Sequence, residues 1–199
     1  MTASELGALL VFATAMAFTP GPNTTLSAAI AANSGLAAAM RFVLAVPLGW
    51  GLMLLACVAG LGTVVAAVPA LSGALKAAGL AYMLVLAWRL ARSAALSTAE
   101  GARLSVGFAQ GVALQFVNVK AWMNALMISA GWVTIDGQVP QRLAIVLPLM
   151  MGYGLASNFT YALVGSSLRR WLAHGRRLVV FNRVLALVLV ATAAWMAWL

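Results

Sequence analysis

An apolar run from Leu6 to Ala32 is interrupted near its middle by the segment Phe18-Thr19-Pro20-Gly21-Pro22-Asn23. About 20 apolar residues suffice to cross a lipid bilayer, so the whole run is long enough to span one. The two prolines have no N–H to donate to the preceding turn, and each restricts the residue before it. Backbone groups freed in this way are tolerated within a membrane only beside protein or water. The interruption therefore predicts a broken helix, with a hinge at Thr19 to Pro22, beside a functional site.

Composition indicates that the rest of the chain is also membrane-embedded. Of the 199 residues, 64% are hydrophobic and 8% are charged, and the mean hydropathy is +1.03. Ordinary soluble domains carry about 25% charged residues. Six apolar spans are predicted, at residues 5–32, 38–62, 68–91, 106–131, 142–167 and 178–198. The expected fold class is an all-α polytopic membrane protein.

The longest polar stretch, residues 93–105, divides the six spans into two sets of three. We expect it to be a cytoplasmic linker between a first half, residues 1–92, and a second half, residues 106–199. Three spans per half give the second half the opposite orientation to the first, which is the arrangement of two inverted repeats. The first span is predicted to break at the membrane midplane, and the fourth span is the second candidate for such a break.

Basic residues set the orientation that we predict. Nine of the twelve Lys and Arg residues fall on one side of the spans: Arg41, Arg89, Arg92, Arg103, Arg169, Arg170, Arg176, Arg177 and Arg183. An excess of this kind marks the cytoplasmic side of a membrane protein, which puts both termini outside. The net charge of +9 is thereby explained without a nucleic-acid partner.

Lys120 lies near the middle of the fourth span, too far from either end for its side chain to reach an interface. A charge at the bilayer centre costs at least about 2.5–3.5 kcal/mol, so such a residue faces a cavity or a partner. The three acids of the chain, Glu5, Glu100 and Asp136, lie near span ends. A cavity with one fixed positive charge attracts an anion or a carboxylate. The alternative is a structural lysine that binds carbonyls freed in the first span.

Polar residues near the two candidate breaks complete a predicted substrate pocket. Asn is among the best N-cap residues, so a half-helix that starts at Asn23 would direct its positive end at the site. The predicted substrate-binding residues are Asn23, Thr24, Asn118, Lys120 and Asn124. Further pocket candidates are Gln115, Tyr153 and Asn158, for which hydrogen bonding between helices is the alternative.

The sequence offers little for other chemistry. His174 is the single His and lies in a basic loop, and Cys57 is the single Cys and lies in an apolar run. Neither a metal site, a disulfide nor a nucleophile with its base is predicted, so we expect no enzyme and no cofactor. Small-residue surfaces, such as Gly107 with Gly111, favour close helix packing and would permit a homodimer.

These residues resemble the lysine exporter (LysE/RhtB) family of bacterial amino-acid efflux carriers. The similarity includes the Phe18–Asn23 segment, Gly35-Leu36, Gly111 and the segment Asn118-Val119-Lys120-Ala121-Trp122. Chain length, six spans and a basic central loop agree with it. The chain departs from the family pattern at two positions: Val119 replaces the usual proline, and Arg41 occupies a position usually held by glycine.

The resemblance implies a secondary-active exporter of an amino acid or amino-acid derivative across the bacterial inner membrane, by alternating access and driven by the proton gradient. The lack of acids near Lys120 favours a neutral over a cationic amino acid. The alternative is a channel, or an exporter of a different small anionic or zwitterionic solute. A channel predicts a polar stripe along several spans, whereas the polar residues here gather at one depth. An intramembrane enzyme and a scaffold protein fit the sequence less well.

Overall fold

The computed structural model describes residues 1–93 and 106–198, and every regular element in these ranges is helical. The elements are α1 (Ala3–Phe18), α2 (Pro22–Ser34), α3 (Leu36–Ala56), η1 (Cys57–Leu61), α4 (Gly62–Ala67), α5 (Pro69–Ser93), α6 (Phe108–Val117), α7 (Val119–Ile128), η2 (Ser129–Val133), α8 (Val139–Leu172) and α9 (Arg177–Trp198). The predicted linker, with Glu100 and Arg103, falls almost entirely outside the described residues.

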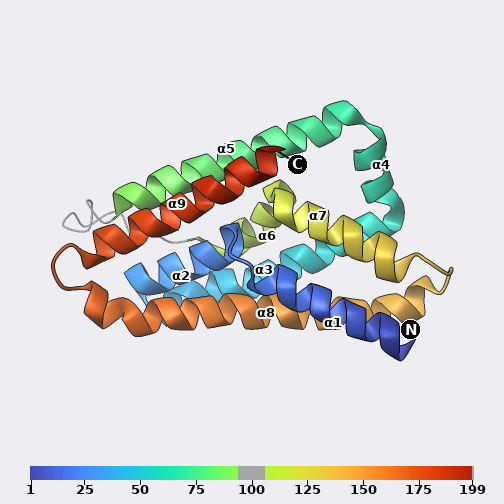
Figure 1. The fold of residues 1–199 in the computed structure, drawn as a ribbon, viewed down its shortest axis with the longest axis horizontal. Coiled ribbons are helices and arrows are strands. Elements are labelled where there is room, and N and C mark those ends of the chain that lie inside the picture. The colour runs from blue at the N-terminus through green and yellow to red at the C-terminus, as the bar shows by residue number, and fades with distance from the viewer. Residues whose placement is uncertain (94–105, 199) are drawn as a thin grey trace.

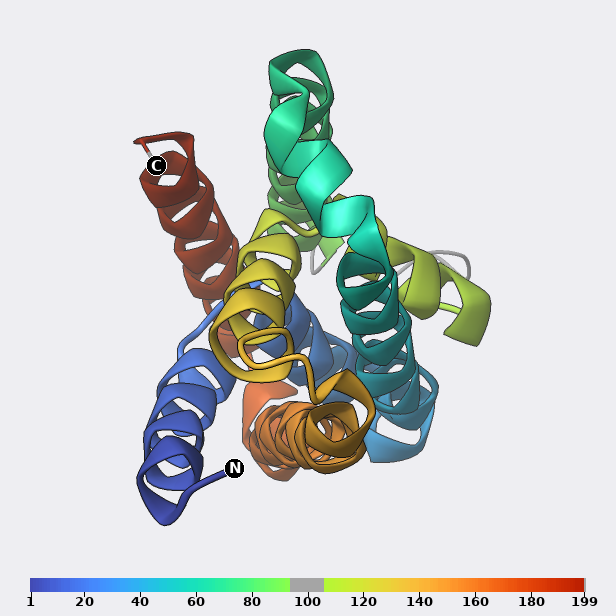
Figure 2. The same cartoon turned by 90° about the vertical axis from the view of Figure 1, so that its right-hand side faces the viewer.

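The long helices lie roughly side by side and form two groups (Figure 1). Helices α2, α3 and α8 pack against one another, while α5 and α9 form an antiparallel pair. In the end-on view, α7 lies between that pair and α8 (Figure 2). Residues of α1, α2 and α7 are thereby brought together, although α7 is separated from α1 and α2 by more than 80 residues of chain.

Four helical segments are long and apolar enough to cross a membrane: Leu36–Val65, Pro69–Ser93, Val139–Leu172 and Arg177–Trp198. The bent pair of α1 and α2 would make a fifth. These segments correspond to five of the six predicted spans. The remaining predicted span, 106–131, contains α6 and α7, which have ten residues each and are separated at Asn118. Neither is long enough by itself to cross a bilayer.

The outward faces of several helices are apolar. On α3, exposed leucines recur one turn apart at Leu44, Leu48, Leu52 and Leu55. Comparable exposed side chains occur on α8 and α9. Soluble monomers rarely expose contiguous apolar surface on this scale, whereas a surface in contact with lipid requires it.

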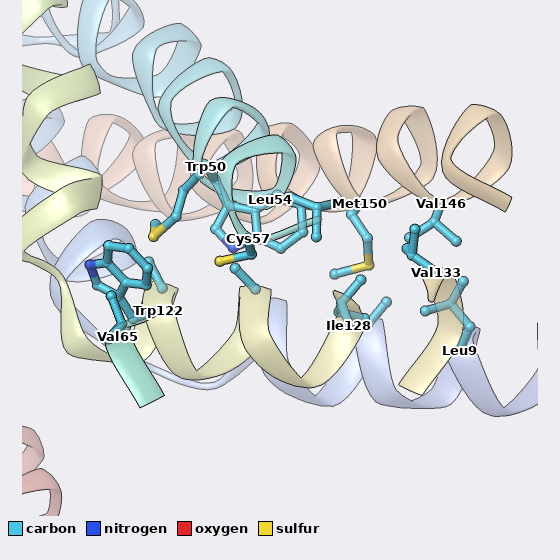
Figure 3. Packing of buried hydrophobic residues seen from close by; sticks show 14 residues of the cluster. Leu9, Trp50, Leu54, Cys57, Val65, Trp122, Ile128, Val133, Val146 and Met150 are labelled. Atoms are coloured by element: carbon cyan, nitrogen blue, oxygen red, sulfur yellow. The ribbon is translucent and has the colours of Figure 1, made fainter. Parts of the chain in front are cut away.

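An apolar core fills the space between α1, α3, α7 and α8 (Figure 3). Leu9 of α1, Leu54 of α3 and Ile128 of α7 are fully or almost fully buried in it. Val146 and Met150 line the facing side of α8. This core holds α1, the helix on the N-terminal side of the break, against α3, α7 and α8.

Candidate functional site

The chain bends by 49° where α1 ends at Phe18 and α2 begins at Pro22. Thr19 and Gly21 both adopt extended backbone conformations. The residues that the sequence predicts as a hinge are therefore those at which the helix is interrupted. The physical cause is the pair of prolines, which cannot supply N–H groups to the end of α1.

Two carbonyls freed at this bend find partners from distant helices. The Tyr161 hydroxyl of α8 donates a hydrogen bond to the Phe18 carbonyl at 2.9 Å. The Lys120 ammonium of α7 donates to the Thr19 carbonyl at 2.7 Å. Lys120 thus makes the structural contact that the sequence left open as an alternative, and its remaining two N–H bonds are not used by this contact.

The start of α2 differs in detail from the prediction. Gly21, not Asn23, is the N-cap residue, and Pro22 occupies the first helical position, so the predicted Asn23 cap was wrong. Proline is favoured there because its fixed φ suits a first turn that needs no N–H. The Thr24 hydroxyl accepts a hydrogen bond from the Gly21 N–H at 3.0 Å. The first-turn N–H groups of Asn23 and Thr24 have no acceptor within the helix.

The side chains of Asn23 and Gln115 pair with each other across α2 and α6. Asn23 Nδ2 donates to Gln115 Oε1 at 2.8 Å, and Gln115 Nε2 donates back to Asn23 Oδ1 at 3.2 Å. Gln115 is fully buried and also donates to the Gly111 carbonyl. The Asn23 side chain therefore serves first to join the two parts of the chain.

A second break separates α6 from α7 at Asn118, whose backbone is extended with φ −88° and ψ 102°. It forms without a proline, because Val119 stands at that position. The Trp122 indole N–H donates to the Phe116 carbonyl at 2.8 Å and so satisfies a group that the break frees. Gly79 of α5 lies directly against the Val117 carbonyl, where a Cβ would come within 2.4 Å.

A cavity of about 80 Å³ lies between the two breaks. One water molecule needs roughly 10–15 Å³ by this measure, so the cavity has room for several waters or for a small solute. Nine predicted residues line it: Thr19, Gly21, Asn23, Thr24, Asn118, Lys120, Asn124, Tyr153 and Asn158. Gln115, Pro20 and Pro22 are not among the residues that line it, although Gln115 binds Asn23, which does.

Within the described part of the chain, three buried polar atoms of residues that line the cavity have no hydrogen-bond partner: Trp50 Nε1, Asn118 Oδ1 and Asn124 Oδ1. Trp50 is 7% exposed and Asn118 is 5% exposed. An unsatisfied buried polar group costs about 1–3 kcal/mol, so each of these atoms favours a hydrogen-bond partner. Side chains that carry one unpartnered donor and two unpartnered acceptors thus line the cavity, besides Lys120.

Sequence reasoning missed Trp50. The available signal was a Trp within an apolar run beside Pro47 and Gly49, because a buried indole usually requires an acceptor for its N–H. Trp50 and Met150 (Figure 3) belong both to the cavity wall and to the apolar core. They close one side of the cavity with apolar surface.

Tyr153 and Asn158 project from α8 into the cavity wall, but both bind neighbouring helices. The Thr14 hydroxyl donates to Tyr153 Oη at 3.2 Å, and the Ser27 hydroxyl donates to Asn158 Oδ1 at 2.9 Å. Asn158 Nδ2 donates to the Gly154 carbonyl at 2.8 Å. These contacts agree with the alternative of hydrogen bonding between helices that the sequence left open.

The electrostatics of the cavity favour a ligand with a negative group. Among the residues that the structure describes, no Asp or Glu lines the cavity. The ion pairs found in the described part of the chain join Arg142 to Glu5 and Asp136, at the start of α8. No group of His, Cys, Asp and Glu side chains within the described ranges could hold a metal ion. Donors and unpartnered amide oxygens in one small cavity suit a zwitterion.

The apolar outer faces and the membrane-length helices define a multi-pass helical membrane protein, and comparison with known proteins gives its family. The chain belongs to the LysE type translocator family, whose model matches residues 14–198. It is therefore a transporter and not an enzyme. No solved structure matches the chain.

Its relatives include proteins called cysteine/O-acetylserine efflux protein. The one from Salmonella typhimurium is 35% identical over 196 residues, and the one from Escherichia coli K12 is 33% identical over 195 residues. The Klebsiella pneumoniae protein is 31% identical over 194 residues. In each case 97% of both chains is covered, so the similarity includes both helix breaks.

Proposed function

We propose that this protein is a secondary-active exporter of a small neutral amino acid or amino-acid derivative across a bacterial inner membrane. The observation that carries the proposal is the cavity between the two helix breaks, with its Lys120 ammonium and its three unpartnered polar atoms. Relatives whose names give cysteine and O-acetylserine as exported solutes support it, because both solutes are small α-amino acids without a cationic side chain.

In the proposed binding mode, the substrate carboxylate binds Lys120 and the first-turn N–H groups of Asn23 and Thr24. The positive end of the α2 dipole favours an anion at this position. The Oδ1 atoms of Asn118 and Asn124 accept hydrogen bonds from the substrate ammonium. The Trp50 indole N–H donates a further hydrogen bond to the substrate. Each of the three unpartnered atoms then has a hydrogen-bond partner.

The proposed membrane arrangement has six spans, in which α1 with α2 and α6 with α7 are the broken first and fourth spans. Residues 1–92 and 106–199 are the two inverted halves, with both termini outside and the basic loops in the cytoplasm. Its support is that the two breaks meet through Lys120 with Thr19 and through Asn23 with Gln115. Broken helices that meet at a central site are typical of carriers with inverted repeats.

Transport then proceeds by alternating access, with the hinge segment as the flexible element. For α1 to move away from α2, the bonds of Lys120 and Tyr161 to the freed carbonyls must change partners. A substrate carboxylate that competes with the Thr19 carbonyl for Lys120 links binding to this movement. The proton gradient is the proposed energy source, as the resemblance to bacterial efflux carriers implies.

The experiment that tests the proposal is ligand-induced thermal stabilisation of the purified protein in detergent. Cysteine, serine and O-acetylserine are compared with their carboxamides. A ligand at 100 times its Kd stabilises the folded state by about 2.7 kcal/mol, so the melting temperature should rise with the acids and not with the amides. Equal stabilisation by acid and amide would refute carboxylate recognition, and this comparison needs no mutation.

Lys120→Ala is expected to abolish both that stabilisation and efflux of labelled amino acid from loaded proteoliposomes. Lys120→Arg, which keeps the charge and a donor to Thr19, serves as the matched variant and should keep part of the binding. Retained transport in Lys120→Ala would contradict the assignment. The dependence of efflux on substrate concentration distinguishes the rival function, because a carrier saturates and a channel gives a rate that rises linearly.

A further inference from the structure

A groove of about 470 Å³ runs along the surface between α5 and α9, away from the central cavity. Small residues form its floor, since Ala87 is 3% exposed and Ala186 is 6% exposed. Larger side chains form its walls: Leu84 and Trp88 on α5, and Arg183, Leu187 and Val190 on α9. The alanines on the inner faces let the two helices approach each other closely. The longer side chains beside them project outward and so form the two walls of the groove.

The register of the two helices gives the groove a direction. Asn182 Nδ2 donates to the Ser93 hydroxyl at 2.9 Å at one end of the pair, and Lys76 Nζ donates to the Ala197 carbonyl at 3.0 Å at the other. Arg183 is therefore at the same end as the C-terminus of α5. Leu84 and Val190 lie further along, toward the middle of the pair. About two helical turns, roughly 10 Å, separate Leu84 from the basic end.

The polar end of the groove is basic and aromatic. The Arg92 guanidinium stacks on the Trp88 ring, with 4.4 Å between its central carbon and the ring centroid. Neither α5 nor α9 contains an Asp or a Glu. Within the described ranges, neither Arg92 nor Arg183 forms an ion pair. As far as the described residues go, this end thus presents two guanidinium groups without an acidic partner beside a Trp, a side chain that prefers the level of lipid headgroups.

We propose that this groove binds one anionic glycerophospholipid, with an acyl chain between α5 and α9 and its phosphate at Arg92 and Arg183. Basic pockets between membrane helices on the cytoplasmic side suit anionic headgroups. Guanidinium groups also match phosphate oxygens in geometry. A second copy of the chain is disfavoured as occupant, because two-fold pairing within a membrane would bring the same arginines together.

The test measures the stability of the protein, purified in a neutral detergent, against added phosphatidylglycerol and against phosphatidylcholine with the same acyl chains. Phosphatidylglycerol should raise the melting temperature, whereas phosphatidylcholine, inorganic phosphate and glycerol phosphate should not. Native mass spectrometry should retain one phosphatidylglycerol per chain. A free phosphate that stabilises equally, or a phosphatidylcholine that does, would overturn the lipid assignment.

Two variants separate the two parts of the site. The double variant Arg92→Gln/Arg183→Gln should weaken phosphatidylglycerol binding about tenfold or more, because each arginine attracts an anionic lipid at the surface. Arg41→Gln removes an exposed arginine of α3 outside the groove and is the matched control. Ala91→Leu should fill the groove and reduce binding with both arginines intact. Unchanged phosphatidylglycerol binding in the double variant would refute the proposal. So would a dimer that forms without lipid and is dissociated by Ala91→Leu, because the groove would then bind a second copy of the chain.

Discussion

Lys120 and Trp50 show how much a single polar atom matters in an apolar protein. The Lys120 ammonium has one acceptor, the Thr19 carbonyl, and can still donate two further hydrogen bonds. The Trp50 indole N–H has no acceptor among the residues that the structure describes. A purely structural lysine would hold the bend closed and need nothing more, whereas the unpartnered N–H of a buried indole lowers stability. The two features together fit a ligand-binding site.

Trp50→Phe should move stability and affinity in opposite directions. It removes an unsatisfied buried donor, so the unliganded protein should melt at the same temperature or higher. The loss of one hydrogen bond to the substrate should weaken binding by about 0.5–1.5 kcal/mol, a factor between roughly 2 and 13. Thermal melting and substrate titration on the same samples measure both quantities.

Trp122→Phe is the matched control for that prediction. Its indole N–H already binds the Phe116 carbonyl, so the same substitution leaves a freed carbonyl without a donor and should lower the melting temperature. If Trp50→Phe destabilises the unliganded protein as much as Trp122→Phe does, the Trp50 indole has a structural partner and no role in the site.

The two helix breaks arise in different ways. Between α1 and α2 the prolines prevent helical hydrogen bonding, so the local sequence by itself determines the break. Between α6 and α7 no proline is present. The Trp122 indole of α7 binds the Phe116 carbonyl across the break, and Gly79 of the distant helix α5 packs closely against the Val117 carbonyl. Tertiary packing can override local helical preference in this manner.

The close packing of α8 on α2 leads to a prediction about how these two helices contact each other. A Cβ on Gly165 would lie 2.2 Å from the Ala28 carbonyl oxygen, which is backbone and cannot rotate away. Gly165→Ala should therefore destabilise the protein by about 1–3 kcal/mol. Gly152→Ala on the same helix is the control, because nothing lies within 4 Å of that position. Alanine favours a helix by up to about 1 kcal/mol over glycine, so this control should be neutral or stabilising.

Equilibrium unfolding in mixed detergent measures both variants. Equal stability of Gly165→Ala and Gly152→Ala would contradict the close approach of α8 to α2. That approach also positions Asn158 against Ser27, so a destabilised Gly165→Ala should lose substrate binding as well as stability.

Across the whole molecule, α8 and α9 begin at opposite ends of the bundle (Figure 1), and polar side chains join the helices at each of these ends. At one end, buried Arg142 binds Asp136 at 2.6 Å and Glu5 at 3.1 Å, which connects the start of α8 to α1. At the other, Asn182 binds Asn33 and Ser93, which connects α9 to α2 and α5. In the proposed alternating-access cycle, these two ends loosen in turn.

The Arg142 cluster predicts a dependence of stability on pH. The hydrogen bond from Arg142 holds the pKa of Asp136 below its ordinary value of 3.8, with help from the Gln138 N–H. A carboxyl group whose pKa is lowered on folding stabilises the protein above its unfolded pKa. That contribution is lost as the pH falls through the folded pKa. The melting temperature should therefore fall as the pH is lowered below about 4.

Asp136→Asn should melt at a lower temperature near neutral pH and show a shallower decline in acid. Glu5 faces the same guanidinium and the chain's N-terminus lies nearby, so Glu5→Gln is measured in parallel. A full acid decline retained in Asp136→Asn would assign the pH dependence to another group. The measurement is thermal melting in detergent over a series of pH values.

The sequence alone was sufficient to predict an all-helical membrane protein and many of the residues that line the cavity between the two helix breaks. Helix-length apolar runs gave five membrane-length segments close to the predicted bounds, because composition and length decide what a bilayer accepts. The paired prolines located the bend, and Lys120 marked the cavity since a charge in an apolar span needs a polar environment. Nine of the predicted residues line that cavity.

Only the tertiary structure decided which polar groups are satisfied and which remain free. Asn23 does not cap α2, and its side chain pairs with Gln115. The side-chain oxygen of Asn158 accepts a hydrogen bond from Ser27. Trp50, which was not predicted, also lines the cavity, and its indole N–H is unpartnered among the described residues. The break at Asn118 likewise depends on α5, which is distant in the sequence. Local pattern cannot determine these outcomes, because a hydrogen-bond partner from another helix is fixed by packing and not by spacing along the chain.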